Sequence, residues 1–297
     1  AQNPTTATNM YNVAVGSDAG GAVTTGTQNT LVGSLAGDAL TTGGLNVAVG
    51  YGALTADDVG SQTVAIGRNA LAAQNYATAT NSLNTAVGYE SGLSVTTGIA
   101  NTLIGTQAGD AITDADYNVA VGNSALSTNQ LGSKSIAIGH SALFTQNPTT
   151  ATDMFNVGIG HAAGISVTTG TFNTLIGGLA GDALTTGSSN VAVGLSALSS
   201  DDVGSKSVAV GTSTLAAQNF TTATDSHNTA VGHEAGNSVT TGDQNTLIGS
   251  LAGDALTTGT RNIAIGVGAL SADTLGGRAT AVGTGALASQ NFTTTAT

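Results

Sequence analysis

Asn12-Val13-Ala14-Val15-Gly16 is the first copy of a five-residue motif that recurs along almost the whole chain. Its general form is Asn-(Val/Thr)-(Ala/Leu)-(Val/Ile)-Gly, and sixteen copies align on the final glycine. These glycines are residues 16, 33, 50, 67, 88, 105, 122, 139, 160, 177, 194, 211, 232, 249, 266 and 283. Three 17-residue intervals are followed by one 21-residue interval, which makes a 72-residue cycle. Short regular periods of this kind are typical of solenoids, in which each repeat forms one turn, here called a rung.

Each motif predicts a short β-strand, because β-branched residues alternate with small or apolar ones. Ala lies three residues after the glycine in fourteen of the sixteen copies, which indicates a tight corner. A second apolar residue follows, so we expect two short strands per turn, stacked in parallel. The expected fold class is all-β, a parallel β-roll or β-solenoid of sixteen rungs, in which three 17-residue rungs are followed by one 21-residue rung. At the usual strand spacing such a stack is about 75–80 Å long.

Domain organisation follows from the repeat. We expect one continuous solenoid over residues 1–297, with cycles at about 12–83, 84–155, 156–227 and 228–297. Residues 2–8 have the same sequence as residues 146–152, so we expect the chain to be a segment of a longer repetitive polypeptide.

Both faces of the predicted strands are apolar, and a period of two does not say which one is buried. We predict that Val and Ile fill the roll and that the Ala/Leu positions face outward. Small outward residues would let a second copy approach closely, as in a parallel bundle. The predicted self-association face contains Ala14, Leu31, Ala48, Ala65, Ala86 and Leu103. The alternative is the reverse, with the Ala/Leu positions inside.

Asn precedes the strand in twelve of the sixteen copies. Stacked Asn side chains can hydrogen-bond to one another along a solenoid axis. Asn also suits a left-handed or Asx-turn backbone at the entry to a strand.

The 21-residue rungs carry four extra residues in Thr-rich loops, which we expect to protrude and make contacts. The candidate contact residues in or beside these loops are Tyr76, Thr78, Thr80, Phe155, Phe220, Thr222, Thr224 and Phe292. Asn219-Phe220-Thr221 and Asn291-Phe292-Thr293 match the N-glycosylation acceptor pattern. Asn219 and Asn291 are therefore candidate glycosylation sites, although Asn and Thr are also ordinary turn residues.

The charge balance disfavours several classes of partner. The chain has a net charge of −12 and only five Lys and Arg residues. Nucleic acids and anionic membrane surfaces are bound by clustered basic residues, so neither is expected as a partner. No apolar run is long enough to insert into a membrane. The absence of Cys excludes disulfides and thiol chemistry.

Candidate metal-binding and catalytic residues are few. His140 and His161 occupy the same position in successive copies, and Asp38, Asp110, Asp182 and Asp254 recur once in each 72-residue cycle. A zinc or calcium site needs several ligands that converge, and residues four rungs apart do not. No Ser, His and Asp set lies on a unique element. We therefore expect no metal, no cofactor and no enzymatic activity.

Two stretches resemble a known family. Thr63-Val64-Ala65-Ile66-Gly67-Arg68-Asn69-Ala70 and Ser135-Ile136-Ala137-Ile138-Gly139-His140-Ser141-Ala142 are similar to the head repeats of YadA-like trimeric autotransporter adhesins, also called hemagglutinin-type β-roll repeats. Residues 84–92 are also similar to repeats of phage tail fibres and bacterial surface fibrils. The resemblance implies a left-handed roll with three chains around one axis. It also implies that Val64 and Ile66 face the roll and Ala65 the neighbouring chains.

These observations favour an extracellular structural rod or fibre that mediates attachment, such as an adhesin head or a tail-fibre shaft on a cell surface or virion. The expected partners are copies of the chain itself, as a trimer or an end-to-end filament, and host-surface or matrix glycans or proteins. The alternative is a self-assembling filament on the cell surface or in the extracellular matrix, with or without a glycan coat, that has no specific receptor.

Overall fold

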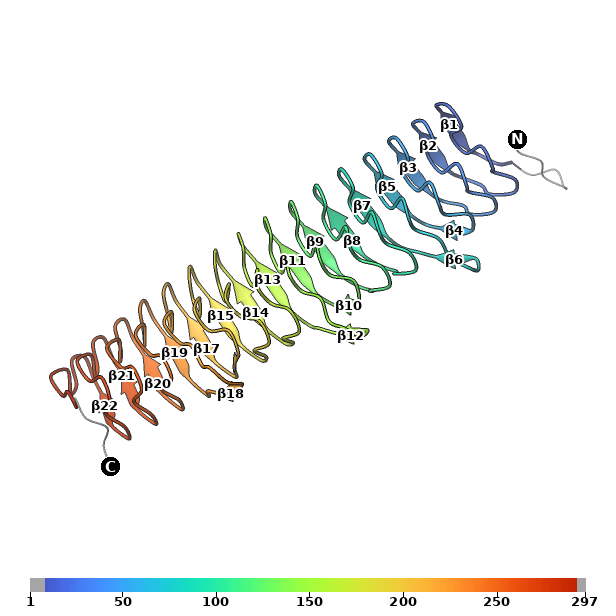
Figure 1. Cartoon of the computed structure of the whole chain (residues 1–297). Coiled ribbons are helices and arrows are strands. Elements are labelled where there is room, and N and C mark those ends of the chain that lie inside the picture. The colour runs from blue at the N-terminus through green and yellow to red at the C-terminus, as the bar shows by residue number, and fades with distance from the viewer. Residues whose placement is uncertain (1–8, 293–297) are drawn as a thin grey trace. The chain divides into compact units, whose positions relative to one another are not determined.

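The computed structural model describes residues 9–292 (Figure 1). All the regular secondary structure in this range is β-strand, in β1 to β22. Two compact units share the chain, Ala1–Asp153 and Met154–Thr297, and each is described separately below.

The first unit is a stack of eight parallel three-residue strands that follow chain order. Each residue pairs with its equivalent one rung later, as Thr30 does with Val47. The register is kept across the longer rung, where Val64 pairs with Thr85. The strands are β1 (Val13–Val15), β2 (Thr30–Val32), β3 (Val47–Val49), β5 (Val64–Ile66), β7 (Thr85–Val87), β8 (Thr102–Ile104), β9 (Val119–Val121) and β11 (Ile136–Ile138).

The second unit repeats this arrangement with eight more strands in parallel register. They are β13 (Val157–Ile159), β14 (Thr174–Ile176), β15 (Val191–Val193), β17 (Val208–Val210), β19 (Thr229–Val231), β20 (Thr246–Ile248), β21 (Ile263–Ile265) and β22 (Thr280–Val282). The predicted parallel β-solenoid with a 17-residue spacing is confirmed.

A second strand in every turn was predicted, and this prediction is wrong. Within residues 9–292, two-residue strands form only beside the 21-residue rungs. They pair as β4 (Gly60–Ser61) with β6 (Thr80–Asn81), β10 (Gly132–Ser133) with β12 (Thr152–Asp153), and β16 (Gly204–Ser205) with β18 (Thr224–Asp225). In other rungs the second apolar residue, such as Leu40 or Ile112, directly follows a turn and is fully buried without forming a strand.

The prediction of which strand face is buried is also wrong, because the Ala/Leu positions fill the interior. In the predicted self-association face only Ala14, in the first strand, is exposed. The other members are buried within their own chain, namely Leu31, Ala48, Ala65, Ala86 and Leu103.

The physical reason for this orientation is the narrow interior. A Cβ atom added to Gly92 or to Gly109 would lie 2.8 Å from a methyl group of Leu103. Leucine therefore fills the space that these corner glycines leave. The β-branched Val, Ile and Thr residues point away from the roll.

Eleven of the twelve Asn residues that precede a strand are buried as well, and Asn12 is half-buried. Asn101 Oδ1 accepts a hydrogen bond from the backbone N of Asn118 (2.9 Å), and Asn101 Nδ2 donates to Ala115 O (2.8 Å). The predicted Asn ladder thus exists, but most of its bonds join a side chain to the backbone of the next rung. The residue in left-handed conformation is the one before the Asn, such as Leu45 (φ 61°) or Tyr117 (φ 57°).

Candidate interaction surfaces

The outward face of the three-residue strands in each unit is an unusual surface of the described residues. Two side chains of every three-residue strand point outward, and they are only Val, Ile or Thr. Ile66, Ile104 and Ile138 are 37–39% exposed. No charged residue interrupts either row. The third position of the strand is Val or Ile in every rung, whereas the first position is Thr in three of eight rungs of the first unit and four of eight of the second, so each unit presents a mostly apolar strip.

Aromatic residues lie along the edges of this strip. At one edge of the first unit, Arg68 Nη1 donates to Tyr89 Oη (2.9 Å), and its guanidinium lies 5.4 Å from the centre of the Tyr89 ring. In the second unit Phe155 and Phe172 stack with their ring centres 5.4 Å apart. Tyr89, Phe155 and Phe172 are 43–57% exposed.

Two of the predicted contact residues have a different role. Tyr76 and Phe220 are each only 5% exposed. Tyr76 Oη donates to Gly98 O at 2.9 Å, which satisfies the buried hydroxyl. Burial of these rings anchors the start of loops 75–80 and 219–224 to the solenoid, so the two rings do not present a contact surface.

The loop tips are the exposed part of the longer rungs. Thr78 and Thr222 are exposed, whereas Thr80 and Thr224 are half-buried. Their hydroxyls bond within the loop, since Thr80 Oγ1 donates to Thr78 O at 2.9 Å and Thr224 Oγ1 to Thr222 O at 2.8 Å.

Phe155 and Phe292 are 46% and 49% exposed. Phe155 stacks on Phe172 at the edge of the sheet, away from the tip of a long loop. The sequence therefore placed the loops correctly but grouped side chains that have different surroundings.

The two candidate glycosylation residues are accessible. Asn219 and Asn291 are both exposed, each at the start of a loop. Thr293, the third residue of the second acceptor triplet, lies outside the described residues. Exposure is necessary for glycosylation but does not demonstrate it, so both sites stay predictions.

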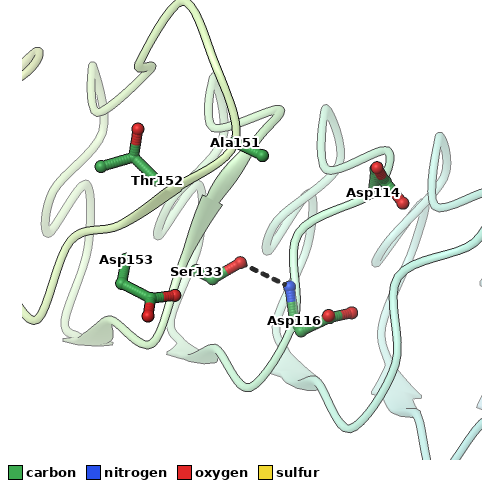
Figure 2. Close-up of a pocket in the computed structure, with 6 residues that line it drawn as sticks. All are labelled: Asp114, Asp116, Ser133, Ala151, Thr152 and Asp153. Atoms are coloured by element: carbon green, nitrogen blue, oxygen red, sulfur yellow. Dashed lines mark hydrogen bonds between the residues drawn. The ribbon is translucent and has the colours of Figure 1, made fainter.

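An open recess lies beside β10 and β12 (Figure 2), with a volume of about 620 Å³. Its carboxylates already have partners in the protein. Asp114 accepts from Thr97 Oγ1 (2.6 Å), Asp116 accepts from the backbone N of Ile99 (2.7 Å), and Asp153 pairs with Lys134 Nζ (2.5 Å). The residues that line it are Asp114, Asp116, Ser133, Ala151, Thr152 and Asp153.

None of the residues considered for metal binding belongs to a group of three or more ligands within residues 9–292. His140 and His161 lie in different units. Asp38 and Asp110 accept hydroxyl hydrogen bonds from the following rung, from Thr55 and Ser127 respectively. Among residues 9–292, no group of three or more His, Cys, Asp or Glu side chains is arranged to hold an ion. In the same range no helix has the length and apolar character needed to cross a bilayer.

Sequence reasoning missed a buried polar cluster beneath the first long loop. Asp57, Gln74, Thr63 and Ser82 are all fully buried. Gln74 Nε2 donates to Asp57 Oδ2 (2.7 Å) and to Thr63 Oγ1 (3.1 Å), and Thr63 Oγ1 lies 2.6 Å from Ser82 Oγ. The signal in the sequence was a recurring pair. In each of the four cycles a Gln lies 17 residues after an Asp or Asn, at Asp57 and Gln74, Asn129 and Gln146, Asp201 and Gln218, and Asp273 and Gln290.

The chain matches no protein-family model, no curated protein and no solved structure.

Proposed function

We propose that the chain is a shaft segment of an extracellular structural fibre that associates with copies of itself and mediates attachment. The observation that carries this proposal is the uncovered strip of Val, Ile and Thr on each unit. Monomeric soluble proteins rarely leave a large continuous apolar strip in water, and such strips are typical of association surfaces.

The size of the strip fits a stable interface. At about 50 Å² for each outward side chain, the first unit exposes on the order of 800 Å², which is what one partner contributes to a standard protein–protein interface. The absence of charge in the outward rows also fits, because interface cores are depleted of charged residues. Parallel copies around one axis, three in the simplest case, would bury the strip of every chain.

Attachment is proposed for the loops, which remain outside such an assembly. The tips around Thr78 and Thr222 recur once per 72-residue cycle, so the fibre presents the same exposed loop at regular intervals. Repeated weak contacts with a surface glycan or matrix protein then sum to strong binding. A filament without a receptor remains the second candidate, and it shares the association surface.

Sedimentation equilibrium tests the association. We expect the wild-type chain to sediment as a multiple of 28.5 kDa and the Ile104→Glu variant to sediment as a monomer with an unchanged circular dichroism spectrum. Thr78→Glu adds the same charge at an exposed loop and is the matched control, which should associate like the wild type. A wild-type chain that stays monomeric at about 100 μM would refute the proposal, since standard interfaces typically give μM or tighter affinity.

Attachment is tested separately, with the assembled wild-type particle on immobilised glycans and matrix proteins. Replacing the loop tips by Gly-Ser should abolish binding and leave the sedimentation unchanged. Association without binding to any surface would favour the filament.

A further inference from the structure

A chain of hydrogen bonds with a fixed direction lies below the first long loop and ends at a buried carboxyl group, that of Asp57. The backbone N of Asn101 donates to Asn84 Oδ1 (2.9 Å), and this bond fixes the Asn84 amide. Asn84 Nδ2 then donates to Gln74 Oε1 (2.9 Å), which fixes the Gln74 amide in turn. Gln74 Nε2 therefore points one hydrogen at Asp57 Oδ2 and the other at Thr63 Oγ1, and Asp57 must act as an acceptor.

The carboxyl group of Asp57 is confined on its other side. Its Oδ1 accepts from the backbone N of Gly60 at 2.8 Å. A Cβ atom at residue 60 would overlap Asp57 Oδ2, so the carboxyl group occupies the space that a larger residue would need. Asp201 has the same surroundings, with Gly204 N at 3.0 Å and Gln218 Nε2 at 2.6 Å.

The second cycle holds a natural neutral counterpart. Asn129 replaces the aspartate there, and its Oδ1 still accepts from Gly132 N (2.9 Å). Its Nδ2, at the place of the second carboxyl oxygen, donates to Gly132 O (2.7 Å). A nitrogen that donates does not accept from the Gln146 amide. Gln146 Nε2 donates to Ser135 Oγ (3.1 Å), which is the counterpart of the bond that Gln74 Nε2 also makes to Thr63 Oγ1 (3.1 Å).

A protonated aspartic acid has the same pattern as Asn129, with one acceptor and one donor atom. Its hydroxyl would turn to Gly60 O, a carbonyl that accepts one bond from Asn46 Nδ2 and has a second lone pair free for another. Gly132 O accepts two such bonds, from Asn118 and Asn129.

We propose that Asp57 and Asp201 are proton-operated latches, in which the ionised carboxylate accepts a hydrogen bond from Gln74 or Gln218 and the protonated acid does not. Each Gln side chain is then held only through the neighbouring hydroxyl and Asn amide, with one bond fewer. Gln74 and Gln218 immediately precede the exposed loops 75–80 and 219–224. Acidification would therefore loosen these two loops and spare loop 147–152. That the latches would regulate attachment rests on the contact role proposed for the loops. The effect of pH on the loops themselves can be measured on the chain without any partner.

The electrostatic surroundings favour protonation of both groups at a pH above that at which an ordinary aspartate titrates. Burial raises the pKa of Asp57 and of Asp201 above the usual aspartate value of 3.8. Asp58 and Asp202 beside them act in the same direction, while the Gln and Gly hydrogen bonds oppose it. The other titratable group near Asp57 is Tyr76, which is neutral because burial and nearby carboxylates raise its pKa.

Hydrogen–deuterium exchange, corrected for the intrinsic pH dependence of exchange, tests the latches. Loss of a hydrogen bond to a charged group should lower the protection of loops 75–80 and 219–224 by about tenfold between neutral pH and pH about 4. Loop 147–152 should keep its protection and serves as the internal control.

Two substitutions complete the test. In Asp57→Asn, the protection of loop 75–80 should be as low at neutral pH as it is in the wild type at acidic pH. The protection of loop 219–224 should still depend on pH. Asn129→Asp should make loop 147–152 pH-dependent. The occurrence of both residue types at this position indicates that both variants fold. Equal pH responses of all three loops, or full protection of loop 75–80 in Asp57→Asn at neutral pH, would overturn the proposal.

Discussion

Replacing Leu103 by alanine tests directly which strand face fills the solenoid. Leu103 is fully buried, and its two methyl groups lie over the corner glycines Gly92 and Gly109. Removal of three carbon atoms from this site loses about 2.4 kcal/mol of transfer free energy at ~0.8 kcal/mol per buried carbon. The cavity that remains raises the total cost to about 3–5 kcal/mol. Gly92 and Gly109 have no side chains that could move in to fill it.

Ile104 is the matched control, one residue along the same strand on the outward face. Because it is 39% exposed and its side chain leaves no enclosed cavity, Ile104→Ala should cost about 1 kcal/mol or less. Thermal unfolding followed by circular dichroism should therefore show a midpoint lowered by about 6–15 °C for Leu103→Ala and by only a few degrees for Ile104→Ala. The measurement is made at the lowest usable concentration, because association through the outward face would stabilise Ile104 by mass action. Equal costs, or a greater cost for Ile104→Ala in the monomer, would refute the assignment of the interior.

Three further predictions concern the backbone, the Asn ladder and the carboxyl groups. Gly105→Ala should destabilise the fold by more than about 4 kcal/mol or prevent folding, because φ is 134° and the new Cβ would lie 2.5 Å from a backbone carbonyl oxygen. Gly268→Ala is the control, because φ there is 61° and the nearest atom would be 3.9 Å away. It should cost only about 1–2 kcal/mol, and urea titrations measure both variants. Asn101→Ala should cost about 2–5 kcal/mol by the same measurement, because it leaves one buried N–H and one buried carbonyl without a partner; a cost below about 1 kcal/mol would contradict the role given to the ladder. Burial raises the pKa of Asp201 in the folded state, so the folded chain binds its proton more tightly than the unfolded chain, and the free energy of unfolding should rise as the pH falls from that raised value towards 3.8. Asp201→Asn should reduce this slope, and an unchanged slope in calorimetry would count against the linkage.

The sequence was sufficient to predict the solenoid, because a glycine at every rung corner imposes a period that no other fold class explains. It could not fix the inward face by apolar patterning, since Leu103 and Ile104 are equally hydrophobic and alternate with a period of two. Polar residues carried the missing information. Thr102 and Thr85 share the position of the outward Val residues, and a threonine inside would need a hydrogen-bond partner in a narrow roll.

The long loops show a second limit of sequence reasoning. An aromatic residue in a loop is equally consistent with a contact surface and with an anchor. Tyr76 is an anchor because its ring reaches the interior and its hydroxyl finds Gly98 O in the following rung. Asp57 and Gln74 likewise come together only in the folded chain, where they are hydrogen-bonded. The repeated 17-residue spacing between them was the one indication in the sequence.

The pairing of each residue with its equivalent in the next rung has a consequence for how such a chain is made and lengthened. Strand partners are always one rung apart along the chain, and this separation stays the same however many rungs are added. The entropy lost in closing one turn depends only on that short separation. A new rung can therefore form as soon as its residues leave the ribosome, on a template that the previous rung supplies. Duplication of a gene segment that encodes one 72-residue cycle would extend the protein without adding a slower step to its folding.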